Sequence, residues 1–275
     1  MQSKFFIMLT SILAFNLQCV AQGDLLITPK RVVFEGNKQK EELNLVNIGQ
    51  DTAIYSISFQ QYNMKEDGGF TQIEKPDSGQ MFADPYLRIF PRRVTLAPRE
   101  PQVVSLQFRR KADMTAGEYR SHLYFRAEKD NKPLGMENGI TDSTQLKVQL
   151  IPIFGLSIPI IIRTGAVNAN ASLSDLKIEF QQDTIPYLNL TINRTGNISV
   201  YGDIIVEYVP LQGTAFQIGS VNGVGVYTNI NKRNVSIKLN KIPGTSFEKG
   251  KLNIQYTGST ETKRFVYTKA ELEMK

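Results

Sequence analysis

The chain has few of the side chains that carry out covalent or metal chemistry. Its 275 residues include one cysteine, one histidine and no tryptophan. The cysteine, Cys19, falls within an N-terminal segment with the layout of a removable signal peptide. The mature chain of about 254 residues therefore has no cysteine, and His122 is its single histidine. These absences exclude disulfides, thiol catalysis and Cys/His zinc sites. We therefore expect function to depend on surfaces and strand edges.

Residues 1–21 have the layout of a cleavable secretory signal peptide. Lys4 provides an early charge, an apolar run extends to Leu17, and the small residues Cys19 and Ala21 stand three and one positions before a possible cut. A lipoprotein would use Cys19 as acceptor, but Gln18 is unfavourable just before it. The apolar run is shorter than the roughly 20 residues that span a bilayer. We expect an exported protein, periplasmic in a bacterium, that is not membrane-embedded.

The charge pattern argues against nucleic-acid binding. Loss of Lys4 with the signal lowers the formal net charge from +6 to about +5. Basic residues are scattered, with local clusters at 92–93 and 109–111, whereas nucleic acid requires a continuous basic face. A modest positive charge is compatible with acidic or carboxylate-bearing partners.

No catalytic motif is apparent. The sequence has no HExxH, GxSxG, phosphate-binding glycine loop or metal-ligand spacing. His122 shares a strand face with Tyr124 and Arg126, and a lone strand histidine is usually structural. We expect no enzyme activity, no cofactor and no metal.

Short alternating strands separated by Gly, Pro and Asn indicate an all-β chain. Two immunoglobulin-like β-sandwich domains in tandem, at 22–162 and 163–275, account for the length. The final residues, 270–275, could form one helical turn. Expected strands lie near 24–35, 39–47, 52–63, 86–91, 101–110, 118–128 and 144–154, then near 172–180, 186–193, 202–209, 215–220, 224–228, 233–240, 250–257 and 263–268.

The order of several segments resembles the PapD-like periplasmic pilus-assembly chaperones. Individually the motifs are loose, consisting of apolar alternation with a few fixed Pro, Gly and Arg, but together they cover most of the mature chain. The first half is similar to the family's N-terminal domain, and the second to its smaller C-terminal domain. The segments are Leu26–Gly36, Leu43–Asn47, Ile89–Pro98, Val103–Arg109 and Gly117–Phe125, then Arg194–Asn197 and Tyr201–Asp203.

The resemblance implies a chaperone that lends its G strand to pilus or fimbrial subunits and delivers them to an outer-membrane usher. A donated strand needs alternate apolar side chains, and Leu146, Val148 and Leu150 alternate with polar residues. A polar loop over 129–143 precedes them, where the family lengthens this strand. The same alternation also fits an edge strand packed on its own sandwich, so both interpretations stay open.

The resemblance also implies a carboxylate anchor between the domains. Arg31 falls on the family's arginine position, and a guanidinium binds a carboxylate bidentately. The family's G-strand lysine is absent, because Phe154 or Gly155 occupies its position. The family's acidic F-strand residue also looks replaced, with Arg120 near it as a possible substitute anchor.

Two other classes of function remain. An extracellular adhesion or glycan-binding module could share the sandwich architecture, although the absence of tryptophan is unfavourable for glycan binding. A β-sandwich hydrolase would need a pair of acids at a cleft, and no motif indicates one.

Overall fold

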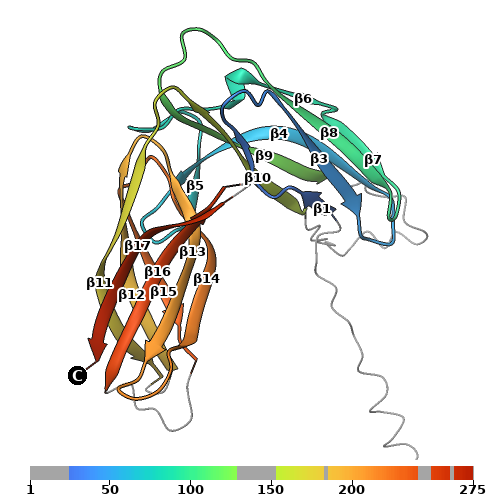
Figure 1. Cartoon of the computed structure of the whole chain (residues 1–275). Helices are drawn as coiled ribbons and strands as arrows, with labels where there is room; N and C mark the ends of the chain where they lie inside the picture. The colour runs from blue at the N-terminus through green and yellow to red at the C-terminus, as the bar shows by residue number, and fades with distance from the viewer. Residues whose placement is uncertain (1–24, 129–152, 183–184, 241–248, 261–262, 275) are drawn as a thin grey trace, which may run out of the picture.

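The structure is a computed structural model that describes residues 25–128, 153–182, 185–240, 249–260 and 263–274. It confirms the all-β prediction, since the described elements are strands apart from one short 3-10 turn, η1 (Asp84–Tyr86). Two β-sandwiches follow one another along the chain and meet at an angle (Figure 1). The chain ends at the far end of the second sandwich.

Two facing sheets form the first sandwich. One has the strand order β1-β3-β8-β6, and the other has the order β2-β10-β9-β4-β5 with β7 also paired to β4. Their bounds are β1 Leu25–Thr28, β2 Val32–Phe34, β3 Lys40–Asn47, β4 Ala53–Met64, β5 Phe70–Ile73, β6 Leu87–Phe90, β7 Arg93–Leu96, β8 Pro101–Phe108, β9 Gly117–Glu128 and β10 Gly155–Thr164.

Apolar side chains alternate with polar ones along these strands, and one face of each sheet is turned inward. The apolar side chains therefore gather between the sheets as the first core. Leu43 and Leu45 of β3, Val104 of β8 and Phe125 of β9 are among the buried side chains. The first strand region is divided between the sheets. β1 pairs with β3, the chain crosses over at 29–31, and β2 pairs in parallel with β10.

The second sandwich pairs a sheet β11-β12-β15 with a sheet β14-β13-β16-β17. Leu188, Ile204 and Tyr256 belong to its separate buried core. The bounds are β11 Ala169–Gln181, β12 Ile185–Gly196, β13 Val200–Val209, β14 Phe216–Val226, β15 Lys232–Lys238, β16 Gly250–Ser259 and β17 Arg264–Met274.

Several predicted elements need correction. The last strand of the first sandwich is β10 at Gly155–Thr164, whereas 144–152 lies outside the described residues. The strands expected at 215–220 and 224–228 are one strand, β14. The helical turn expected at the C-terminus is wrong, because β17 continues in ladder with β16 as far as Met274. β5 and β7 were not predicted.

Candidate functional site: an apolar groove and a buried ion cluster between the sandwiches

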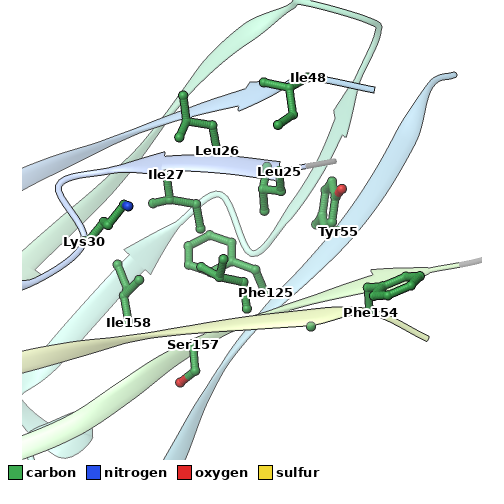
Figure 2. Close-up of a pocket in the computed structure, with 12 residues that line it drawn as sticks. Leu25, Leu26, Ile27, Lys30, Ile48, Tyr55, Phe125, Phe154, Ser157 and Ile158 are labelled. Atoms are coloured by element: carbon green, nitrogen blue, oxygen red, sulfur yellow. The ribbon is translucent and has the colours of Figure 1, made fainter. Parts of the chain in front are cut away.

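An apolar groove opens along one edge of the first sandwich, between β1 and the start of β10. Its volume is about 480 Å³. Leu26 and Ile48 lie at one wall, while Phe125 and Ile158 lie deeper (Figure 2). The groove exists because β1 pairs away into the other sheet, and β2 joins β10 only from Ile160 onward. The two sheets are therefore not closed over this stretch.

The even-numbered side chains of β10 grade from exposed to buried. Ile158 is 2% exposed, but Leu156 is 39% and Phe154, just before the strand, is 50% exposed. Strand side chains repeat every second residue, and in the sequence the same spacing occurs farther back at Pro152, Leu150, Val148 and Leu146. These last three predicted partner-binding residues lie outside the described residues. Phe154 and Leu156 have the same alternate spacing and were not predicted as site residues from the sequence.

A buried ion cluster joins the two sandwiches. Glu118 of β9 is buried and forms ion pairs with Arg120 at 2.6 Å and with Arg163 of β10 at 3.3 Å. Its Oε2 also accepts hydrogen bonds from the backbone N–H and hydroxyl of Ser199, at 3.1 and 2.8 Å. Burial opposes ionisation of Glu118, but these cations and donors hold its pKa well below the usual range. The carboxylate therefore stays charged between the sandwiches.

Contrary to expectation, β9 keeps an acidic residue at this interface: Glu118 lies two positions before Arg120. Arg120 itself is committed to local contacts. Its Nη2 donates to Glu118 and, at 2.8 Å, to the Ser199 hydroxyl, and its guanidinium lies 3.7 Å from the ring centroid of Tyr227. The structure thus places Arg120 as a link between the sandwiches, while the anchoring role predicted for it stays a prediction.

Arg31, the other predicted anchor, lies beside this cluster. It is half-buried at the crossover before β2, and its guanidinium stacks 4.6 Å from the ring centroid of Tyr201 in the second sandwich. Its Nη2 is buried with no hydrogen-bond partner among the described residues. Burial, followed by the charges of Arg120 and Arg163, lowers the Arg31 pKa to about 10. A buried donor facing like charges is a favourable place for an anion.

His122 belongs to an aromatic cluster at the same interface. It is 6% exposed, its Nε2 lies 3.3 Å from the Tyr227 hydroxyl, and its ring meets Tyr62 edge-on with centroids 4.9 Å apart. Phe70 packs against both His122 and Tyr227. Burial, aided by the nearby charge of Arg120, lowers the His122 pKa to about 3. The imidazole is therefore neutral at physiological pH, in a packing role.

The hairpin between β4 and β5 docks on the second sandwich. Asn229 donates to the Met64 carbonyl at 2.8 Å, and the Asn234 N–H donates to the Glu66 carbonyl at 2.7 Å. Arg194 stabilises the loop that carries Tyr227 and Asn229. Its guanidinium donates hydrogen bonds to the backbone carbonyls of residues 196, 198, 228 and 230. These contacts together fix the orientation of the two sandwiches.

No group of three or more His, Cys, Asp or Glu side chains among the described residues could hold a metal ion. No helix within the described ranges has the length and hydrophobicity needed to cross a bilayer.

No protein-family model matches the chain, and no curated protein matches its sequence. Solved structures do resemble it. Among them are chaperones of fimbriae or pili. At these identities the likeness concerns the fold.

One similar structure is a chaperone–tip adhesin complex of CFA/I fimbriae biogenesis, with 14% identity, a TM-score of 0.45 and coverage of 90% of this chain and 100% of that chain. Another is the CsuC–CsuE chaperone–tip adhesion subunit complex of Acinetobacter baumannii archaic pili, with 13% identity, a TM-score of 0.45 and coverage of 90% and 98%. A third is the SafA pilin in complex with the SafB chaperone of Salmonella enterica, with 10% identity, a TM-score of 0.41 and coverage of 92% and 97%.

Proposed function

We propose that this protein is a periplasmic chaperone that binds pilus or fimbrial subunits by adding a strand to them, and that it passes them to an outer-membrane usher. The observation that carries the proposal is the row of apolar side chains at the open edge of the first sandwich. Leu156 and Phe154 leave the core and become solvent-exposed beside an apolar groove. Exposed apolar strand edges invite pairing with other chains, and a client strand would cover this one.

Leu146, Val148 and Leu150 have the same alternate spacing in the sequence and are the proposed donor side chains. Each apolar side chain that is fully buried in a client contributes about 1.5–3 kcal/mol before ordering costs. Three such contacts would account for most of a micromolar affinity, which corresponds to about 8 kcal/mol. No group on these side chains supports chemistry, so the proposed role is one of binding.

Arg31 is the proposed anchor for a carboxylate of the client. Its Nη2 is buried without a hydrogen-bond partner among the described residues, and its guanidinium stacks on Tyr201 of the second sandwich. Arg120 and Arg163 add positive charge nearby, although the carboxylate of Glu118 already pairs with both. An incoming carboxylate would give Arg31 the counter-charge that it lacks among the described residues.

The test is co-expression with fimbrial subunits encoded in the same genome, followed by affinity purification of the chaperone. Replacing Leu146, Val148 and Leu150 together by alanine should leave the chaperone folded and abolish subunit recovery. Unfolding of this variant, with unchanged binding per folded molecule, would show that the three side chains belong to the core. Arg31→Ala should weaken capture at least about tenfold, or about 1.4 kcal/mol. An unaltered affinity would remove Arg31 from the site.

A further inference from the structure

Tyr201 connects the second sandwich to Arg31 of the first. It is the second residue of β13 and lies two positions after Ser199, whose backbone N–H and hydroxyl both donate to Glu118. The guanidinium of Arg31 packs on its ring, 4.6 Å from the centroid. Because the contact between Ser199 and Glu118 fixes the start of β13 against the first sandwich, the Tyr201 ring has a defined place beside Arg31.

Two glycines of β14 leave room for this ring. Gly225 is the cross-strand partner of Tyr201, and a Cβ there would lie 3.3 Å from the Tyr201 Cδ2 atom. At Gly223 a Cβ would lie 2.9 Å from the phenolic oxygen, and the φ of +71° at this residue is one that other residues rarely adopt. A side chain at either position would therefore crowd the ring, whereas the bare backbone of β14 supports it.

The charges around Arg31 favour movement of its side chain out toward solvent. Arg120 and Arg163 repel the guanidinium more strongly than Glu118 attracts it. Its Nη2 has no hydrogen-bond partner among the described residues. Holding a long side chain in one conformation also costs conformational entropy. The orientation of Arg31 therefore needs a contact that offsets both the repulsion and the entropy.

The Tyr201 ring supplies such a contact. The face of an aromatic ring attracts a guanidinium that lies within about 6 Å of the centroid, and arginine stacks on tyrosine in this way. A ring contact of this kind uses no N–H group of the guanidinium as a hydrogen-bond donor, so Nη2 stays available to a carboxylate. The Tyr201 side chain is 40% exposed, which leaves this region open to solvent.

We propose that Tyr201 is a positioning residue for Arg31: its ring, supported by Gly223 and Gly225, holds the guanidinium in the orientation that receives an anion. This inference rests on the anchoring role proposed for Arg31 and assigns control of that anchor to the second sandwich. A guanidinium that adopts the receiving orientation for only a fraction of the time binds with an affinity reduced by that fraction. The second sandwich therefore contributes to client affinity through Arg31.

The probe is sodium acetate, titrated at constant ionic strength into the purified, isotope-labelled protein. The readout is the side-chain Nε–Hε NMR signal of Arg31, assigned with Arg31→Lys. Tyr201→Phe keeps the aromatic face and should bind acetate within about twofold of the unmodified protein, whereas Tyr201→Leu should bind it about three- to tenfold more weakly. The matched control, Tyr187→Leu in β12 of the same sandwich, should leave acetate binding unchanged.

Two further readouts distinguish positioning from packing. Because Tyr201 is partly exposed, Tyr201→Leu and Tyr201→Phe should have similar thermal midpoints, while nitrogen relaxation should show a more mobile Arg31 Nε in Tyr201→Leu alone. An Arg31 signal that does not respond to acetate in the unmodified protein, or equal acetate affinities of the two Tyr201 variants, would overturn the inference. Recovery of co-expressed subunits alongside either negative result would show that the positioning role failed and not the chaperone function.

Discussion

Replacing Glu118 by glutamine tests whether the buried ion cluster joins the two sandwiches. Glu118 is 1% exposed and accepts hydrogen bonds from Arg120, Arg163 and twice from Ser199. Glutamine has nearly the same shape, but it carries no charge and presents an NH2 group to donors. Arg120, whose side chain is 10% exposed, would then be a buried cation without its counter-ion.

Removal of one partner from a buried ion pair typically costs 3–5 kcal/mol, because the other charge stays desolvated. We therefore expect Glu118→Gln to lower the free energy of unfolding by about 3–5 kcal/mol in urea denaturation followed by far-UV circular dichroism. Small-angle scattering should also show a wider range of angles between the sandwiches. The matched control is Glu271→Gln, which removes an exposed ion pair with Lys251 and should cost at most about 1 kcal/mol. A loss below about 1 kcal/mol for Glu118→Gln would refute the reasoning.

Two further predictions concern His122 and Gly202. The His122 pKa is about 3 in the fold, against 6.5 as its usual value, so the stability it contributes is complete above pH 6.5 and is lost as the pH falls toward 3. Between pH 7 and pH 5 the free energy of unfolding of the unmodified protein, measured by urea denaturation, should fall by about 2 kcal/mol more than that of His122→Gln. Equal losses in the two proteins would contradict the assignment. At Gly202 an added Cβ would overlap the backbone carbonyl of Thr257, so Gly202→Ala should cost about 1–3 kcal/mol, against less than about 1 kcal/mol for Gly69→Ala. Equal thermal stability of the two alanine variants would argue against this close approach.

The sequence predicted the strands better than it predicted the site. The alternation of apolar and polar residues predicted the position of most strands to within a few residues. This works because each strand turns one face toward the core, and that pattern can be read from the strand's own sequence. Gly223 and Gly225 made β14 look like two strands. Short β5 and β7 carry too few alternating residues to stand out, and the tail appeared helical because its pairing with β16 is a tertiary contact.

The contacts between the two sandwiches join residues that are distant in the sequence. Glu118 meets Ser199 across 81 positions, and Arg31 stacks on Tyr201. Composition and spacing carry no signal for such pairs, so neither Tyr201 nor the role of Glu118 was predicted from the sequence, whereas Arg31 was predicted from the family resemblance. The exposed side chains of Phe154 and Leu156, in contrast, were detectable as the continuation of the Leu146, Val148 and Leu150 alternation.

Site-specific photo-crosslinking tests the strand-edge account most directly. A photoreactive phenylalanine analogue is introduced at Leu156, which is exposed beside the groove, or at Phe180, an exposed residue of β11 in the second sandwich. With a co-expressed fimbrial subunit, irradiation should give a crosslinked chaperone–subunit product at Leu156 and none at Phe180. Efficient crosslinking at Phe180 with none at Leu156 would place the client on another surface and contradict the account.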